Sequence, residues 1–324
     1  MKYTFFVYHH KTGESLMKKI FSNYSLAELC EKKAEKRISR YKQGKPLRGI
    51  KFRKYLHPLV LGFLVADKIQ QREKIVVVNN KSKCRKGNPV IYACNHIGGN
   101  EIERAFLVIK KPAYLMLGNP GILYRSPIWL FMIMNGVISI ETLNREDRKV
   151  GYQRAVELLT KGGSLLIFPE GAWNVTPNLP VMKTFTGTVR MAKESGREII
   201  PMAVQQYGKT LYYNIGENYS IPCDTEKSVD ELNKELREKL CTLEWEIMEK
   251  CSEVLKRETV PDGYLDMYQS EIINRSAYGF TLQAAIDESF HDKTVIDSKE
   301  VFSFYDKLKV NHSNAFLLNK RFHN

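Results

Sequence analysis

The chain has 324 residues, of which 43% are hydrophobic, and this length and composition suit a folded globular protein and exclude a disordered one. No apolar run reaches the roughly 18 residues that a membrane-spanning helix needs, and the amino-terminal residues lack the apolar region of a secretory signal. Six scattered cysteines without a CxxC pair exclude a recognisable zinc site and a disulfide framework. We therefore expect a protein of the cytoplasmic side that holds no metal and no bound cofactor.

The net charge of +14 is concentrated at the amino-terminal end. Residues 1–86 hold 22 lysines and arginines against 6 acidic residues, whereas the rest of the chain carries a small net negative charge. Such a basic segment is typical of proteins that meet a polyanion, either anionic lipid head groups or nucleic acid. A merely solvated basic surface is the alternative.

The first predicted elements, within residues 1–72, are basic helices. Ser25 and Glu28 have the spacing of a capping box and mark the start of one helix. A second helix is predicted over Ile50–Ile69, where cations at the start precede the apolar body Leu56–Leu64. This pattern suits a helix that lies in a membrane interface, but a core helix with a charged start shows it equally well.

From residue 74 onward, strand-like and helix-like segments alternate. Apolar runs predict strands at Ile75–Val78, Val90–Cys94, Tyr114–Leu117, Val137–Ile140, Ser164–Phe168 and Ile199–Val204. Amphipathic segments predict helices at Asn100–Lys110, Ile122–Met134, Arg148–Lys161 and Phe185–Ser195. The alternation predicts an α/β fold with a mostly parallel sheet flanked by helices, extended by helical segments at both ends.

After Pro222 the pattern becomes that of one long helix. Ser228 and Glu231 form a second capping box, and apolar residues recur at three- and four-residue steps from Val229 to Val254. We expect this helix to pack on the α/β domain. The expected organisation is a basic helical membrane-surface segment at residues 1–73, the α/β domain at 74–222 and a helical extension at 223–324, with no role assigned to 258–324.

The stretch VIYACNHIGGNE, residues 90–101, joins a predicted strand to a predicted helix. The strand delivers Asn95 and His96 to its carboxyl end, glycines then allow a tight turn, and Asn100 is expected to cap the helix. Sites in open α/β sheets form in the crevice outside the carboxyl ends of the strands. His96, with Glu101 five residues on, has the arrangement of a base and its orienter, although a lone histidine is often purely structural. His96 is the only histidine between residues 58 and 290.

Two further strands end in the same manner. The strand Ser164–Phe168 is followed by Pro169, Glu170 and Gly171, which places a carboxylate beside a glycine at the same crevice. The strand Ile199–Val204 supplies an apolar wall beyond it. Several strand-end motifs in order are stronger evidence of a site than one alone.

These blocks resemble those of the lysophosphatidic acid acyltransferase family, the PlsC-like glycerolipid acyltransferases. Asn95-His96 with Glu101 is similar to the NH-x4-D motif, and Phe168–Gly171 is similar to the FPEG motif. Gly136–Glu141 stands where the family has its second block, and Ile200–Val204 stands where it has its proline-containing fourth block. The resemblance covers roughly residues 75 to 210.

The resemblance implies an O-acyltransferase of phospholipid biosynthesis that acts at the cytoplasmic face of a membrane as a peripheral or monotopic protein. His96 would take a proton from the acceptor hydroxyl, which attacks a fatty acyl thioester of CoA or acyl carrier protein, while Glu101 holds the imidazole. By the family pattern, Asn95, Glu170 and Gly171 help to hold the acceptor, and the wall near Pro201 faces the acyl chain. The implied partners are membrane lipids and the acyl donor, not nucleic acid; the oligomeric state is left open.

Three departures from the family pattern bear on the acceptor. Glu101 replaces the usual aspartate, and Thr142 and Trp173 stand where the second and third blocks have arginines that bind the acceptor's phosphate. The substitutes nearest in sequence are Arg145, Lys183 and Arg190, each of which can equally be a simple surface cation.

Three other interpretations stay open at this point. The chemistry can act on a glycolipid or another alcohol, with Trp173 stacked on a sugar face or simply buried. The chain can be a catalytically inactive relative that binds lipid. It can also be a nucleic-acid-binding protein, which would explain the basic segment but not the ordered strand-end motifs.

Overall fold

The computed structural model describes residues 25–83, 87–125, 128–176, 179–251, 259–275 and 281–288, all of which lie in one compact unit. The first 24 residues of the predicted basic segment and the last 36 residues of the predicted extension lie outside this description, as do residues 252–258 at the end of the predicted long helix.

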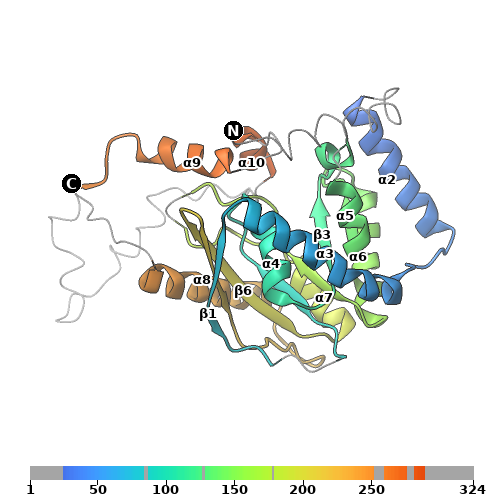
Figure 1. Cartoon of the computed structure of the whole chain (residues 1–324). Coiled ribbons are helices and arrows are strands. Elements are labelled where there is room, and N and C mark those ends of the chain that lie inside the picture. Colours follow the sequence, from blue (N-terminus) through green and yellow to red (C-terminus); the bar gives the residue numbers. More distant parts are fainter. Residues whose placement is uncertain are drawn as a thin grey trace, which may run out of the picture. The chain divides into compact units, whose positions relative to one another are not determined.

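A seven-stranded sheet forms the centre of the molecule (Figure 1). Its strands in spatial order are β1 (Lys74–Asn80), β7 (Thr210–Ile215), β6 (Ile199–Tyr207), β2 (Ile91–Cys94), β5 (Ser164–Ile167), β3 (Ala113–Gly118) and β4 (Val137–Ile140). Every neighbouring pair is parallel except β6 and β7. The predicted α/β fold is thus confirmed, and each of the six predicted strands is present to within a few residues.

The seventh strand, β7, is missing from the prediction. It follows β6 after the two-residue turn Gly208–Lys209, where Gly208 has a positive φ of 57°, and it pairs antiparallel with β6 before pairing parallel with β1. Leu211, Tyr213 and Ile215 are buried at alternate positions along it. A glycine-led turn followed by this alternation is the signal that could have identified the hairpin.

The helices follow the predicted segments closely. They are α2 (Leu26–Lys42), α3 (Ile50–Gln70), α4 (Glu101–Ile109), α5 (Ile128–Asn135), α6 (Arg145–Thr160), α7 (Gly187–Ser195), α8 (Val229–Cys251), α9 (Tyr264–Asn274) and α10 (Leu282–Glu288), with a 3₁₀ helix, η1, at Gly121–Arg125. Both capping boxes form, Ser25 with Glu28 and Ser228 with Glu231. The single helix predicted over Ile122–Met134 is wrong: η1 and α5 replace it, because a proline at 127 disfavours helical backbone at the residue before it.

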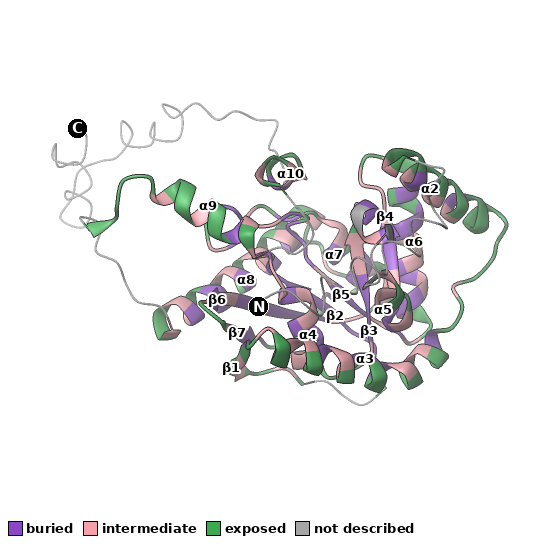
Figure 2. Cartoon of the chain, turned by 45° about the horizontal axis from the view of Figure 1, so that its top comes forward, coloured by how far each residue is buried: buried purple, intermediate pink, exposed green. Residues whose placement is uncertain are grey.

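Helices cover both faces of the sheet, and successive residues of β2 point to opposite faces. Ile91 and Ala93 pack in a core with side chains of α6, α7 and α8, whereas Tyr92 and Cys94 pack in a second core with side chains of α3 and α4. Figure 2 shows the central strands as buried between these helices. The carboxyl ends of the strands are left to loops, which is where the predicted motifs meet.

The helix α3 has two apolar faces. Val60 and Leu64 are buried in the second core, while Tyr55 is 81% exposed and Leu59 is 62% exposed. The helix thus packs on the core by one face, as predicted for a core helix, and its exposed apolar face leaves the predicted membrane-interface helix as a prediction. No helix among the described residues is long and apolar enough to cross a membrane.

Candidate active site

The carboxyl end of β2 holds His96 by its backbone. The His96 N–H donates to Oε1 of Glu170 at 2.7 Å, and its carbonyl oxygen accepts from the N–H of Asn174 at 2.7 Å. Gly98 and Gly99 follow with φ of 83° and 75°, a left-handed conformation that glycine adopts without strain. This turn brings the chain straight into α4, so that Glu101 begins the helix.

The side chains of His96 and Glu101 face each other across this turn. Nδ1 of His96 lies 2.6 Å from Oε1 of Glu101, whose side chain is 1% exposed. The Tyr213 hydroxyl donates to the backbone carbonyl of Glu101 at 2.7 Å and so fixes the start of α4. Because Nδ1 faces a carboxylate, the neutral imidazole carries its proton there, which leaves Nε2 as the basic nitrogen.

Two aromatic rings hold the imidazole of His96 in place. The Phe168 ring centroid lies 4.6 Å from that of His96 in a tilted arrangement, and the Trp173 centroid lies 6.3 Å away, edge to face. Both residues belong to the loop that follows β5. The imidazole is therefore held on one side by the Glu101 carboxylate and packed by two rings of the loop after β5.

The helix α4, which carries Glu101, is anchored by a buried arginine. Arg104 is fully buried, and its guanidinium donates to Glu73 at 2.5 Å and to Asp67 at 2.8 Å. Asn100 stands at the N-cap position, but its side chain donates to Glu73 at 2.9 Å and makes no capping hydrogen bond. The expected capping role of Asn100 is therefore wrong, because the Glu73 carboxylate is the acceptor that its amide meets.

Asn95 lies entirely inside the protein. Its amide oxygen accepts from the N–H of Val204 at 2.7 Å, and its amide nitrogen donates to the carbonyl of Val204 at 3.0 Å and to Glu244 at 3.2 Å. These bonds clamp the end of β2 to β6 and α8. The structure therefore gives Asn95 a positioning role in place of the predicted contact with the acceptor.

Glu170 also differs from its predicted role. Its side chain is fully buried, and its second oxygen accepts from the N–H of Met182 at 2.6 Å, so both oxygens hold backbone amides. Burial raises the pKa of Glu170 to about 8. Gly171 has a φ of 74°, and a Cβ added there would lie 2.6 Å from the Phe185 ring. Glu170 and Gly171 thus shape the loop that supports His96, and the predicted contact of the exposed Gly171 with the acceptor stays a prediction.

The remaining predicted residues lie apart from this arrangement. Arg145, Lys183 and Arg190 are all exposed, and Arg190 lies beside Tyr152 of α6. Pro201 is buried within β6, next to Leu243 of α8 and Gly216, so it belongs to the core. The predicted apolar wall near Pro201 stays a prediction.

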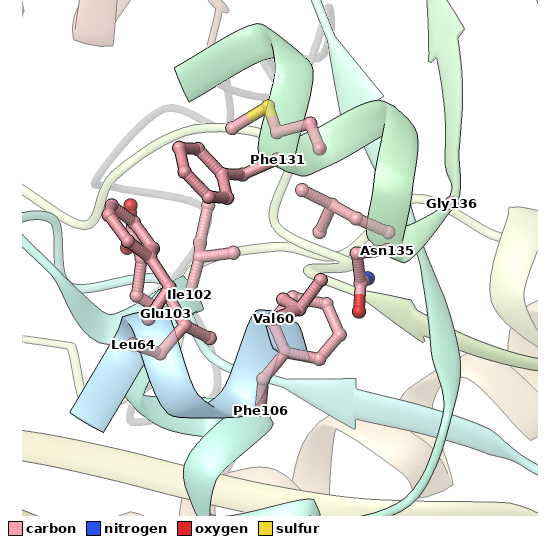
Figure 3. Close-up of a pocket in the computed structure, with 11 residues that line it drawn as sticks. Val60, Leu64, Ile102, Glu103, Phe106, Phe131, Asn135 and Gly136 are labelled. Carbon is pink, nitrogen blue, oxygen red and sulfur yellow. The ribbon is translucent and has the colours of Figure 1, made fainter. Parts of the chain in front are cut away.

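An apolar pocket lies elsewhere, between α3, α4 and α5 (Figure 3). Val60 and Leu64 of α3, Ile102 and Phe106 of α4, and Phe131 of α5 point into it. Because Ile102 directly follows Glu101, the pocket lies beside the helix that carries the acid of the site.

The ends of β3 and β4 hold a polar cluster that the sequence analysis missed. Asn119, which follows β3, accepts at Oδ1 from the backbone N–H of Thr142 at 2.9 Å and from its hydroxyl at 2.8 Å. Arg37 of α2 forms a two-point ion pair with Asp147 and donates to the Tyr124 hydroxyl at 2.7 Å. Nothing in the local sequence distinguishes Arg37 from the other cations of its helix.

Residues 75–205 match the family model described as Acyltransferase. The chain is 25% identical over 142 residues to the 1-acyl-sn-glycerol-3-phosphate acyltransferase of Borreliella burgdorferi, which covers 44% of this chain and 55% of that protein. It is 23% identical over 160 residues to the chloroplastic 1-acyl-sn-glycerol-3-phosphate acyltransferase LPAT1 of Arabidopsis thaliana, covering 49% of this chain and 44% of that one.

The chain thus spans about half the length of these curated relatives. Among solved structures, it resembles the crystal structure of the 1-acyl-sn-glycerophosphate acyltransferase PlsC of Thermotoga maritima, with a TM-score of 0.50 and 16% identity. That match covers 75% of this chain and all of the other, and it shows a shared fold.

Proposed function

We propose that this chain, built on an acyltransferase-family domain, moves a fatty acyl group from a thioester donor to a hydroxyl of a lysophosphatidate-like glycerolipid. The donor would be acyl-CoA or acyl carrier protein, and the reaction would belong to phospholipid biosynthesis. The observation that carries the proposal is the 2.6 Å contact of His96 with Glu101 at a strand end, inside the residues that match the family.

The geometry suits general-base catalysis. Nε2 of His96 takes the proton of the acceptor hydroxyl, and the oxygen attacks the carbonyl carbon of the thioester. Glu101 accepts from Nδ1–H and stabilises the imidazolium that forms. When the tetrahedral intermediate collapses, the C–S bond breaks, and the thiolate takes the proton that His96 holds. An ester bond replaces the thioester bond, and the balance requires neither an acyl-enzyme nor a further cofactor.

The pocket between α3, α4 and α5 is our candidate for the acyl chain (Figure 3). Its lining is mostly aliphatic and aromatic, which suits a hydrocarbon chain. It is lined by Ile102 of α4, the residue that directly follows Glu101. Two of its walls, α3 and α5, also expose several apolar side chains on the surface.

We place the membrane surface at these two helices. Phe52, Tyr55, Leu59 and Ile69 of α3 and Leu130 of α5 are each more than 60% exposed. Phe63 of α3 stacks on Phe131 of α5 with centroids 3.8 Å apart, so the two helices form one surface. Exposed lysines of α3 add attraction to anionic lipids. This supports peripheral or monotopic attachment, and we place it at the cytoplasmic face.

The head group of the acceptor is a separate question. The names of the relatives make phosphate the first head group to test, but Thr142 is hydrogen-bonded to Asn119 and Trp173 packs beside Tyr268, Ile272 and Leu282. At the two positions where the family has arginines, the side chains of this chain thus contact other parts of the protein. This observation favours a glycolipid or another neutral alcohol as a second candidate acceptor.

A screen of lipid acceptors tests the proposal. The purified full-length chain is mixed with radiolabelled acyl-CoA and a panel of monoacyl lipids in detergent micelles, and labelled diacyl product is measured. We expect product with at least one lipid. Binding to liposomes without product from any acceptor, with CoA or with acyl carrier protein as donor, would instead support an inactive lipid-binding relative.

A further inference from the structure

The helices α9 and α10 lie against the loops that frame His96. Ile272 of α9 and Ala285 of α10 are almost fully buried in a small hydrophobic cluster with Val175 and Trp173, both from the loop after β5. The side chain of Gln269 donates to the carbonyl of Val175 at 3.3 Å. Figure 1 shows the two helices in orange near the top of the picture. They form a cap, defined here as residues 264–274 and 282–288.

The cap also contacts the turn that follows His96. A Cβ added to Gly98 would lie 3.2 Å from Cγ2 of Ile272, and one added to Gly99 would lie 3.3 Å from Cβ of Arg275. Glycine at these two positions therefore allows the end of α9 to approach the turn closely, in addition to allowing the positive φ angles. The end of α9 closes over the residues between the base and its acid.

The other end of the cap reaches the strand ends of β3 and β4. Nδ2 of Asn119 donates to Oε1 of Glu288, the last residue of α10, at 2.8 Å. Oδ1 of the same amide is held by Thr142, so the orientation of Asn119 is fixed. β3 lies two strands from β2, and strand spacing therefore puts this cluster about 10 Å from His96. This distance is within the reach of the head group of a glycerolipid whose hydroxyl meets His96.

The charges at this end of the sheet disfavour the binding of an anionic head group. Arg37 is paired with Asp147 and lies 3.7 Å from Glu141, so one guanidinium already faces two carboxylates. Glu288 brings a third carboxylate, and the second guanidinium of this region, that of Arg148, donates to the Thr142 carbonyl. Burial raises the pKa of both Glu141 and Glu288, because removal from water disfavours a negative charge there, and a phosphate dianion would meet the same penalty. A phosphate site would instead offer arginine forks or free backbone amides.

We propose that Glu288 is the residue that selects the head group of the acceptor, and that it selects a neutral, hydroxyl-bearing group over a phosphate. Its carboxylate accepts hydrogen bonds from hydroxyls and repels a phosphate dianion. This inference rests on the proposed acyl transfer and narrows its acceptor class. It assigns the cap a role in specificity and explains how the chain does without the family's two arginines.

Three acceptors with the same acyl chain test the proposal: lysophosphatidate, monoacylglycerol and a glycosyl monoacylglycerol. With the full-length protein and one acyl-CoA, we expect kcat/KM for a neutral acceptor to exceed that for lysophosphatidate by about tenfold or more. Glu288→Gln keeps the shape of the side chain and its hydrogen bond to Asn119 but removes the negative charge. The ratio of kcat/KM for the neutral acceptor to kcat/KM for lysophosphatidate should therefore fall about tenfold, because activity on lysophosphatidate rises.

Two variants serve as controls. Asp287→Asn removes the same charge from the exposed neighbouring residue and should leave the ratio unchanged. Ile272→Ala loosens the cap and should lower activity on all three acceptors together. A wild-type preference for lysophosphatidate that Glu288→Gln leaves unaltered would overturn the inference. Loss of that preference in Arg148→Gln would point to the Arg148 guanidinium, which donates to the Thr142 carbonyl, as the group that binds the phosphate instead. Absence of product from every acceptor would overturn the proposed function instead.

Discussion

Nδ1 of His96 and Oε1 of Glu101 lie 2.6 Å apart, although one residue ends a strand and the other begins a helix. The contact closes a turn through Gly98 and Gly99, whose positive φ angles a residue with a side chain would adopt only with strain. The acid is held in turn by α4, which Arg104 anchors to α3. The pair is therefore preorganised by the fold and does not depend on substrate to form.

The length of the acid side chain is the first point to test. Glu101→Gln removes the negative charge that stabilises the imidazolium, and we expect severe impairment. Glu101→Asp restores the residue that the family motif has, but it draws the carboxylate back from Nδ1, and a displacement near 1 Å costs about 10²-fold in rate. Initial rates with saturating acyl-CoA measure both. An Asp variant faster than the wild type would show that the surroundings have not adapted to glutamate.

The buried acids predict how stability depends on pH. Burial raises the pKa of Glu170 to about 8 and that of Glu244 well above its ordinary value. Between about pH 5 and pH 8 the Glu170 carboxyl is ionised in the unfolded chain but protonated in the folded protein, and the raised pKa of Glu244 acts in the same direction. The folded state then binds more protons, so the free energy of unfolding should fall as the pH rises through this range.

Urea unfolding at pH 5.5, 6.5 and 7.5 measures this dependence. Glu170→Gln removes one of the two groups, and its stability should vary less with pH than that of the wild type. The variant should also be less stable at pH 5.5. One of the two backbone N–H groups that donate to Glu170 would then face the NH₂ group of Gln and lose its hydrogen bond, which costs about 1–3 kcal/mol. Rising stability from pH 5.5 to 7.5 would contradict the assigned protonation.

The surface of α3 predicts two separable components of membrane binding. Replacing Tyr55 and Leu59 together by serine removes apolar side chains that are 81% and 62% exposed. Because apolar burial is not screened by salt, this variant should lose the binding to anionic liposomes that remains at high salt. Co-sedimentation at 0.05 M and 0.5 M salt measures both components.

The matched variant for the charge component is Lys51→Gln with Lys54→Gln on the same helix. Each lysine near an anionic surface contributes at most about 1 kcal/mol, so this variant should lose affinity at low salt and match the wild type at high salt. Neither variant alters a residue of the active site. Unchanged liposome binding by both would place the membrane surface on another face of the protein.

Strand ends and helix starts were predictable because their signals are local. The run before His96 is apolar, two glycines follow it, and the capping boxes at Ser25 and Ser228 each need only four residues. The same local signals predict that His96 and Glu101 lie within reach of each other.

The partners of buried polar groups were not predictable, because they come from distant parts of the chain. Asn95 meets Val204 and Glu244, which are 109 and 149 residues away in sequence, and Glu170 meets the backbone of His96. A motif names these residues but cannot show whether a side chain faces substrate or core. The cap was missed for a related reason: Ile272 is buried only because Trp173 and Val175 are beside it.

The central claim, that His96 is the base of an acyl transfer, is tested most directly by one comparison of rates. Transfer of a labelled acyl group from acyl-CoA to the best lipid acceptor is measured for the wild type and for His96→Ala at equal concentrations of folded protein. General-base catalysis predicts a loss of roughly 10²- to 10⁴-fold with the unfolding midpoint little changed. Activity of the variant within threefold of the wild type would contradict the claim and remove His96 from the mechanism.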